Sequence, residues 1–234
     1  MKIGLLAAGA PPDALVPRYG DYPSMFRRLL AGRGYAFQDY DVRAGVFPAA
    51  PEDCEAYLVT GSACGVYDPE PWIADLIAFL RQAKGRARLV GVCFGHQVMA
   101  EAFGGRVIKS PKGWGVGLHR HSLSDDRPGW AGAGPAGYAL AASHQDQVVE
   151  APPGARVAGG SGFCPMGLIA YGDQPAMSIQ LHPEFEPAYA KALIEGRRGE
   201  RIAADVADAA VRSLDAPDDH VRAAGWFDAF LQGA

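Results

Sequence analysis

Apolar and polar residues follow two alternating patterns along the first half of the chain. Short apolar runs are typical of strands in a parallel sheet that is buried on both faces. Apolar residues spaced three and four apart are typical of helices with one buried face. The runs predict strands at 2–9, 36–42, 56–61 and 88–93, and the spacing predicts helices at 22–31, 71–83 and 95–103. Strands that alternate with helices predict an α/β fold, a parallel sheet with helices on both faces.

The pattern changes beyond residue 104. Glycine, proline, aspartate and serine now separate short apolar pieces, which predicts an antiparallel or mixed β extension. These pieces lie at 106–108, 116–118, 138–141, 148–149, 167–171 and 176–181. Helical spacing returns at 189–194, 202–214 and 220–231, and the charged segment 196–201 predicts a solvated connection. Because no linker is evident, we expect a single domain over 1–234, with a core over 1–190 and a C-terminal helical extension over 191–234.

Composition and charge narrow the classes of function. Hydrophobic residues make up 49% of the chain and charged residues 21%, which excludes intrinsic disorder. The formal net charge is −4 and no basic stripe occurs, so we expect no nucleic-acid partner. No apolar segment approaches the roughly 20 residues of a membrane helix, so we expect no membrane partner. Residues 1–10 imitate a short signal peptide but fit a first buried strand better, and we expect a cytoplasmic protein.

One of the four cysteines stands at a sharp turn. Cys93 ends a buried strand within the sequence GVCFGHQ, and a helix is expected to begin two residues later. Gly91 and Gly95 occupy the two places where a strand–nucleophile–helix turn needs small residues. A helix N-terminus favours a thiolate, and the N–H of Phe94 can point at a developing oxyanion. We interpret Cys93 as a nucleophile; the alternative is a buried structural thiol.

A nucleophilic cysteine needs a base and a group that orients the base. Of the six histidines, His182 alone ends an apolar strand with a carboxylate, Glu184, two residues further on. Residues i and i+2 of an extended segment lie on one side, so Glu184 can accept a hydrogen bond from His182. The segment 60–63, TGSA, ends the preceding strand of the sheet, and its backbone amides can supply a second oxyanion donor. The alternative is an ordinary glycine turn.

Three motifs together carry a resemblance. GVCFGHQ at 91–97, SHQDQV at 143–148 and HPE at 182–184 look like the class I glutamine amidotransferase domain, over about residues 1–190. The resemblance implies a flavodoxin-like parallel sheet with a small antiparallel extension, no cofactor and no metal. It also implies the following site: catalytic Cys93, His182 and Glu184; oxyanion donors Ser62 and Phe94; and, around the γ-glutamyl group, Gly61, Gln97, Ser143, His144, Gln145 and Asp146.

The chain departs from the usual amidotransferase pattern in its oxyanion loop. The family usually has Ser-Gly-Gly-Pro where this chain has Thr60-Gly61-Ser62-Ala63. Ser62 lacks the freedom of glycine to adopt positive φ, so the oxyanion hole is expected to be arranged differently or to be permanently formed. Residues 67–68, 71–73 and 112–114 are similar to a stand-alone branch that contains the plant γ-glutamyl peptidases. The residues after Glu184 are too few for an ATP-pyrophosphatase domain, so any synthetase is expected on a separate chain.

These expectations leave alternatives for the function. The favoured one is an enzyme that cleaves a γ-glutamyl amide through a γ-glutamyl thioester. With glutamine, ammonia would pass to a separate synthetase subunit; with a γ-glutamyl peptide, the enzyme would act alone. A binding or regulatory module without turnover is the third possibility.

Three weaker patterns have plainer interpretations. The segment 112–117 is expected to form a glycine-rich hairpin rather than a phosphate loop, since no strand-then-helix setting surrounds it. His119 and His121 could share a strand face as metal ligands do, but we expect them to be solvated or hydrogen-bonded. A docking face for the last helix, on this domain or on a partner, is predicted by Trp226, Phe227, Phe230 and Leu231.

Overall fold

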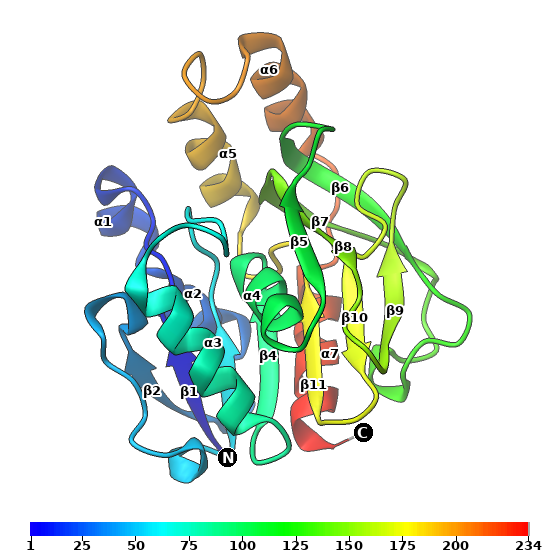
Figure 1. The fold of residues 1–234 in the computed structure, drawn as a ribbon. Coiled ribbons are helices and arrows are strands. Elements are labelled where there is room, and N and C mark those ends of the chain that lie inside the picture. The colour runs from blue at the N-terminus through cyan, green and yellow to red at the C-terminus, as the bar shows by residue number, and fades with distance from the viewer. Residues whose placement is uncertain (234) are drawn as a thin grey trace.

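A nine-stranded sheet crosses the computed structural model, which describes residues 1–233 (Figure 1). The strand order is β2-β1-β3-β4-β11-β10-β9-β6-β7. The first five strands in this order are parallel to one another. They are β2 (Ala36–Tyr40), β1 (Lys2–Leu6), β3 (Ala56–Val59), β4 (Arg88–Val92) and β11 (Ala176–Ile179). The expected flavodoxin-like parallel sheet is therefore present.

The other four strands continue the same sheet with antiparallel pairing. They are β10 (Leu168–Tyr171), β9 (Ala155–Gly160), β6 (Gly115–Leu123) and β7 (Gly137–His144). A separate antiparallel pair consists of β5 (Arg106–Lys109) and β8 (Asp146–Glu150). Strand β9 was not predicted, because glycine and alanine dilute its apolar pattern. The run at 176–181, assigned above to the extension, instead supplies the parallel strand β11.

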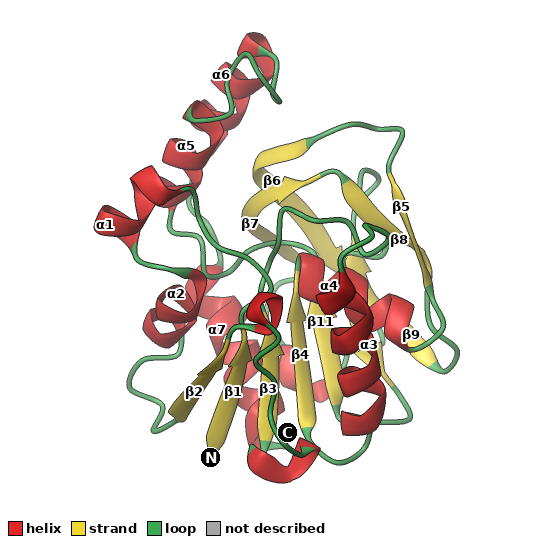
Figure 2. Cartoon of the chain, turned by 60° about the vertical axis from the view of Figure 1, so that its left-hand side comes forward, coloured by secondary structure: helices red, strands yellow, loops and turns green. Residues whose placement is uncertain are grey.

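Helices cover both faces of the parallel half (Figure 2). On one face, α3 (Pro71–Ala83) and α4 (Phe94–Ala102) pack against strand residues such as Leu6 and Val59. On the other face, α2 (Tyr22–Leu29) and α7 (His220–Gln232) pack against residues such as Leu5 and Val90. These helices form where the spacing of apolar residues predicted them, because each buries one apolar face.

Helix α7 docks on the sheet of its own chain. Trp226, Phe227, Phe230 and Leu231 are buried, and Trp226 meets Tyr138 of β7 edge to face, with 5.2 Å between the ring centroids. The aromatic face predicted for this helix is therefore covered within the domain.

The remaining helices lie above the carboxyl ends of the parallel strands (Figure 2). They are the short α1 (Val16–Tyr19), α5 (Pro187–Glu195) and α6 (Ala204–Ser213). Helix α6 lies on β6, where Gly117 approaches it so closely that a methyl group there would come within 2.8 Å of Ala210 Cα. No helix among residues 1–233 combines the length and the apolarity needed to cross a bilayer.

Candidate active site

The turn between β4 and α4 places Cys93 at the carboxyl edge of the parallel strands. Cys93 has φ of 54°, and it is the one residue other than glycine with positive φ in the described part of the chain. A methyl group on Gly91 would overlap the carbonyl of Gly95, and one on Gly95 would overlap the carbonyl of Val59. The two glycines therefore permit the tight packing of α4 against the strands. This packing holds Cys93 in a conformation that costs roughly 1–3 kcal/mol.

His182 and Glu184 form a buried pair directly after β11. His182 Nδ1 and Glu184 Oε1 are 2.7 Å apart, and the His182 ring stacks on Phe185 with 3.9 Å between centroids. The backbone N–H of His182 donates to the carbonyl of Ala141 at 2.9 Å, which ties this segment to β7. The pair, the stacked ring and this bond fix the position of the imidazole.

Charge determines the protonation state of His182. Burial lowers the pKa of the imidazole, but the negative charges of Glu184 and Cys93 and hydrogen bonds to both outweigh burial and raise the pKa to about 10. The ring is therefore an imidazolium over the physiological range. Cys93 and His182 are neighbours, because both lie within 4 Å of the place that a methyl group on Gly61 would occupy.

The loop after β3 lies against both Cys93 and His182. A methyl group on Gly61 would lie 3.1 Å from His182 Cε1 and 3.8 Å from Cys93 Cβ. Thr60 holds the loop, because its hydroxyl accepts from the N–H of Ala8 at 3.0 Å and donates to the carbonyl of Gly61 at 3.1 Å. Gly9 underlies it so closely that a methyl group there would be 2.5 Å from that carbonyl. Only a glycine at position 9 fits this approach.

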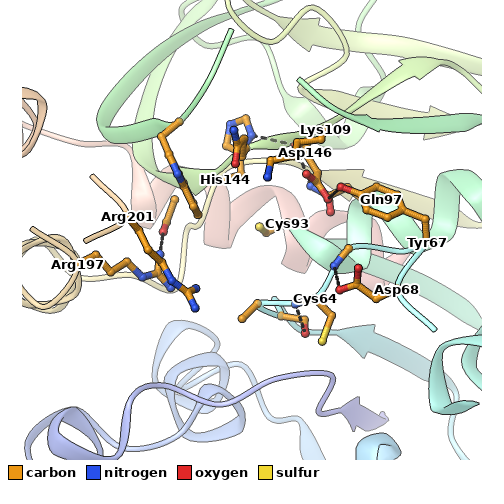
Figure 3. Close-up of a pocket in the computed structure, with 16 residues that line it drawn as sticks. Cys64, Tyr67, Asp68, Cys93, Gln97, Lys109, His144, Asp146, Arg197 and Arg201 are labelled. Carbon is orange, nitrogen blue, oxygen red and sulfur yellow. Dashed lines mark hydrogen bonds between the residues drawn. The ribbon is translucent and has the colours of Figure 1, made fainter. Parts of the chain in front are cut away.

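A cavity of about 450 Å³ opens above Cys93 (Figure 3). This size falls within the roughly 300–1,000 Å³ of small-molecule sites. The residues that line it come from five separate parts of the chain: 62–68, 93–97, 109–114, 143–146 and 197–201. Figure 3 shows Tyr67, Asp68, Gln97 and Asp146 on one flank of Cys93, and Arg197 and Arg201 on the opposite flank.

Hydrogen bonds organise the first flank. Gln97 Nε2 donates to the carbonyl of Asp146 at 2.9 Å and to Gln180 Oε1 at 3.1 Å. Tyr67 donates its hydroxyl proton to Asp146 Oδ2 at 2.8 Å. Burial raises the pKa of the Asp146 carboxyl, and the bond from Tyr67 and the charge of Lys109 oppose that rise. This flank therefore offers both acidic and basic groups to a bound molecule.

His144 contributes a neutral ring to the cavity wall. Its Nδ1 lies 3.1 Å from the carbonyl of Asp146, so Nδ1 carries the proton and donates. Burial lowers the pKa of His144 to about 3. A ring that stays neutral at physiological pH cannot supply the proton that an imidazolium supplies, so His144 and His182 differ in the charge they bring to the site.

The other residues expected at the site occupy different places around it. Ser62, Gln97, Ser143, His144, Gln145 and Asp146 line the cavity together with Cys93. Gly61 and Phe94 lie behind this surface, and so do His182 and Glu184, which are 3% and 4% exposed. The φ of Ser62 is not positive. The cavity therefore does not need glycine at this position of the loop.

The expectation for segment 196–201 was wrong at Arg197. Arg197 is half-buried rather than solvated, and both Arg197 and Arg201 line the cavity. Tyr67, Lys109 and Trp114 also line it without having been predicted to. Two adjacent arginines in a glycine-flanked charged run were the available signal for Arg197, but such runs are usually surface connections.

The weaker patterns have structural explanations. His121 is buried with Nδ1 at 3.3 Å from the hydroxyl of Tyr138, and His119 lies edge to face with Phe163, 5.2 Å between centroids. In the segment at 112–117, Lys112 Nζ donates to the carbonyls of Gly162 and Phe163 at 2.6 and 2.9 Å. The ammonium group of Lys112 thus binds the neighbouring loop at 162–163.

The fold and the corner cysteine define a class before any relative is considered: an α/β protein with a strand–cysteine–helix turn at the carboxyl edge of a parallel sheet. The model of the family described as glutamine amidotransferase class-I matches residues 44–195. The chain belongs to this family. The enzyme class expected from the sequence, a C–N hydrolase of the glutamine amidotransferase type, is confirmed by this match.

Individual relatives and a solved structure are similar over most of the chain. A glutamine amidotransferase-like protein of Schizosaccharomyces pombe is 28% identical over 215 residues, 86% of each chain. Gamma-glutamyl peptidase 2 of Arabidopsis thaliana is 29% identical over 184 residues, 75% of this chain and 73% of the peptidase. The crystal structure of a glutamine amidotransferase from Thermotoga maritima matches with a TM-score of 0.75 and 18% identity, over 98% of this chain and 96% of that one. This last match shows a shared fold.

Proposed function

We propose that this chain hydrolyses γ-glutamyl amides with Cys93 as nucleophile, His182 as acid and base, and Glu184 as the group that orients His182. One observation carries the proposal: the strained Cys93 and the buried His182–Glu184 pair both lie against the loop at Gly61, and Cys93 lines a cavity. The pair comes from the end of β11, which is the direct neighbour of β4 in the sheet. Adjacent parallel strands thus deliver nucleophile and base to the same edge.

The chemistry proceeds in two halves. The Cys93 thiolate attacks the γ-carbonyl carbon, forming a C–S bond and a tetrahedral oxyanion. The oxyanion collapses, the C–N bond breaks, and the His182 imidazolium gives its proton to the departing nitrogen. Neutral His182 then takes a proton from water as the water oxygen attacks the γ-glutamyl thioester. Glutamate leaves when the C–S bond breaks, and thiolate and imidazolium are restored.

The developing oxyanion needs hydrogen-bond donors. The backbone N–H of Phe94, first residue of α4, and that of Ser62 are the proposed donors. The closeness of Gly61 to His182 and Cys93 supports this role, because the next amide in the loop is then near the reacting carbon. The two hydrogen bonds of the Thr60 hydroxyl hold this loop in place, which favours an oxyanion hole that is formed before substrate binds.

The identity of the departing amine distinguishes two forms of this function. If the substrate is glutamine, ammonia leaves, and a separate synthetase subunit would accept it. If the substrate is a γ-glutamyl peptide, an amino acid or peptide leaves, and the chain acts alone. The similarity to gamma-glutamyl peptidase 2 over 75% of this chain supports the second form.

Replacement of Cys93 tests the proposal and separates it from a silent binding module. We expect Cys93→Ser to release no glutamate from glutamine, glutathione or γ-glutamyl dipeptides, whereas the wild-type chain cleaves at least one of them. A diazo-ketone analogue of glutamine should label the wild-type chain stoichiometrically, and peptide mapping should place the label on Cys93. Cys164, buried at the antiparallel end, is the matched control, and Cys164→Ser should be labelled like the wild type. Turnover by Cys93→Ser, or a wild-type chain that is neither labelled nor active, would contradict the proposal.

A further inference from the structure

One flank of the cavity carries positive charge that the proposed chemistry does not use. Arg197 and Arg201 line this flank, and they come from the segment between α5 and α6. Figure 3 shows both guanidinium groups on the side of Cys93 away from Asp68 and Asp146. The segment begins just beyond residue 195, where the match to the family model ends. The flank is therefore a feature of this chain outside the matched region.

The segment is a compact turn. The carbonyl of Arg197 accepts from the N–H groups of Arg201 and Ile202 at 3.0 and 3.1 Å. This turn brings residues 197 and 201 to neighbouring positions, as one turn of helix would. The backbone thus presents the two arginines to the cavity together.

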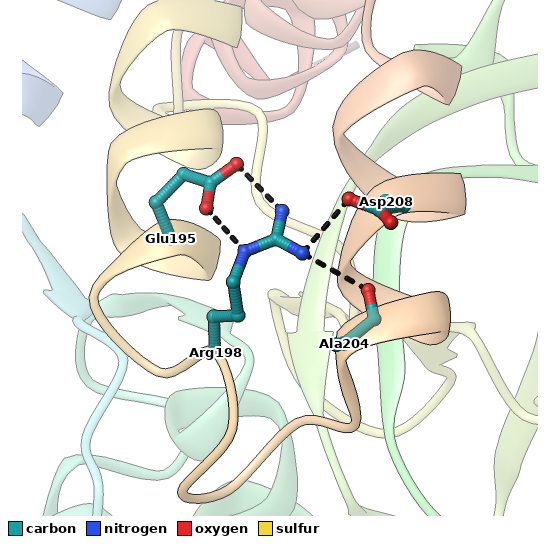
Figure 4. A network of polar contacts seen from close by, with 4 residues as sticks. All are labelled: Glu195, Arg198, Ala204 and Asp208. Atoms are coloured by element: carbon teal, nitrogen blue, oxygen red, sulfur yellow. Dashed lines mark hydrogen bonds and ion pairs between the residues drawn. The ribbon is translucent and has the colours of Figure 1, made fainter.

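Arg198 anchors the turn from its other side (Figure 4). Its guanidinium donates to both carboxylate oxygens of Glu195 at 2.6 and 2.8 Å, to Asp208 Oδ1 at 2.8 Å and to the carbonyl of Ala204 at 3.0 Å. These bonds connect the end of α5 to α6. Arg198 therefore pairs with Glu195 and Asp208, and these two carboxylates do not pair with Arg197 or Arg201.

Arg197 is held in place without a counter-ion. Its Nη1 donates to Ser143 Oγ at 2.8 Å, and its guanidinium lies over the ring of Trp114, 5.8 Å from the centroid. Within the described residues, neither Arg197 nor Arg201 forms an ion pair with a carboxylate, although nine other arginines do. Burial lowers the pKa of Arg197, and Tyr22 and Tyr189 oppose this shift most. A half-buried arginine stays charged, so its environment favours an anion in the cavity.

We propose that Arg197 and Arg201 bind a carboxylate on the departing amine, so that the preferred substrates are γ-glutamyl amino acids or peptides whose leaving group is anionic. The inference rests on the proposed function, because it assumes cleavage at Cys93. The opposite flank, with Asp68, Lys109 and Asp146, has charges of both signs and suits the α-ammonium and α-carboxylate of the γ-glutamyl group. The reacting carbonyl then lies over Cys93, and the leaving group extends toward the arginines.

Substrates differ in whether their leaving group carries a carboxylate that the two arginines can bind. Ammonia has no carboxylate, so glutamine gains nothing from Arg197 and Arg201. An amino acid joined through its nitrogen has a carboxylate one carbon away, which a guanidinium can bind through two N–H groups. The two arginines therefore favour γ-glutamyl amino acids and peptides over glutamine as substrates, which is the form of the function in which the chain acts alone.

Two substrates of nearly equal shape test the inference on the unaltered enzyme. γ-Glutamylglycine carries the carboxylate, and γ-glutamylglycinamide replaces it with a neutral amide. We expect kcat/KM to be about tenfold or more higher for γ-glutamylglycine, since a charge-assisted hydrogen bond contributes enough free energy for that ratio. Equal values for the two substrates, or a preference for the amide, would overturn the inference.

Variants identify the residues responsible. Arg197→Met and Arg201→Met should each lower the ratio of the two kcat/KM values, and the double variant should bring it near one, while Arg197→Lys should retain part of it. Arg212→Met, on the exposed side of α6, is the matched control and should keep the wild-type ratio. If the methionine variants lower kcat/KM for both substrates and for glutamine equally, the arginines bind the γ-glutamyl group itself, and the inference is wrong. A chain that cleaves none of these compounds would instead contradict the proposed function.

Discussion

In the proposed mechanism, the side chains around Cys93 divide into groups that react and groups that set their charge. Cys93 has the strained backbone and the proposed nucleophilic sulfur, whereas the proposed role of Glu184 is to act through His182, with 2.7 Å between Oε1 and Nδ1. Burial alone would leave His182 neutral, as it does His144, which lines the cavity nearby. The largest difference between the two rings is the carboxylate of Glu184 beside His182, and the charge of Cys93 acts in the same direction.

Replacement of that carboxylate should change the pH profile. The pKa of His182 is raised to about 10, so the acid form is present below that pH and is lost as pH rises through it. Glu184→Gln removes the largest influence that raises the pKa, and burial then lowers it. We expect the alkaline limb of kcat to move to lower pH by at least one unit in this variant, with kcat reduced by about 10²-fold or more. An alkaline limb at the wild-type position in Glu184→Gln would contradict the role given to this residue.

The site residues that sequence could predict share a local signal. Gly91, Cys93 and Gly95 predict a sharp turn within five residues. His182 and Glu184 predict a hydrogen-bonded pair within three residues. Arg197 and Tyr67 carry no such signal, because their position depends on how a distant loop folds back over the cavity. Their contacts, to Ser143 and Asp146, span 54 and 79 residues of sequence.

The β4–α4 turn depends on glycine at positions 91 and 95, where a side chain would not fit. Gly91→Ala would place a methyl group against the carbonyl of Gly95 and the sulfur of Met99, so α4 would have to move away from the strand. We expect this variant to lose about 1–3 kcal/mol of stability, as overpacked sites do, and most of its activity. Denaturant unfolding and glutamate release measure the two effects.

Gly225→Ala is the matched control for that variant. Gly225 lies inside α7 with nothing within 4 Å of an added methyl group. Alanine should raise stability by about 0.5–1 kcal/mol there because it favours a helix interior, and it should leave activity unchanged. If Gly91→Ala were as stable and as active as this control, the tight turn would not be a requirement of the fold.

The helices and parallel strands could be predicted because their own residues determine them. Helix α3 has the predicted bounds, since Pro71 suits its first turn and its apolar residues repeat on one face. The order of the antiparallel strands could not be predicted, because β9 pairs with β10 on one side and with β6 on the other. The pairing of these strands depends on packing across the sheet, which leaves no pattern in the sequence of the strand itself.

The chain should unfold as one unit. A single buried cluster contains Leu5 and Val90 from the parallel strands, Leu140 and Ala158 from the antiparallel strands, and Phe227 from α7. Because this cluster joins the core over 1–190 with the C-terminal extension, a single domain is expected to lose both at once. Thermal unfolding followed by far-UV circular dichroism and by tryptophan fluorescence should give coincident transitions. Separate transitions for the two signals would show that the extension is an independent unit.

The cavity itself is a property of the assembled chain, since five separate parts of the sequence line it. The bond that Cys93 is proposed to form can be detected directly in one species, the covalent intermediate of the reaction. The thioester between Cys93 and the γ-glutamyl group exists between the departure of the amine and the attack of water.

Acid quenching during turnover, followed by intact-mass spectrometry and peptide mapping, tests for this intermediate most directly. We predict a population of chains heavier by one γ-glutamyl group, with the added mass on the peptide that contains Cys93 and sensitive to hydroxylamine. The adduct should be absent from Cys93→Ser. It should accumulate when His182, the proposed proton acceptor, is replaced by asparagine and an activated γ-glutamyl ester is supplied. Steady turnover by the wild-type chain with the added mass on another residue, or turnover that persists in Cys93→Ser, would contradict the account.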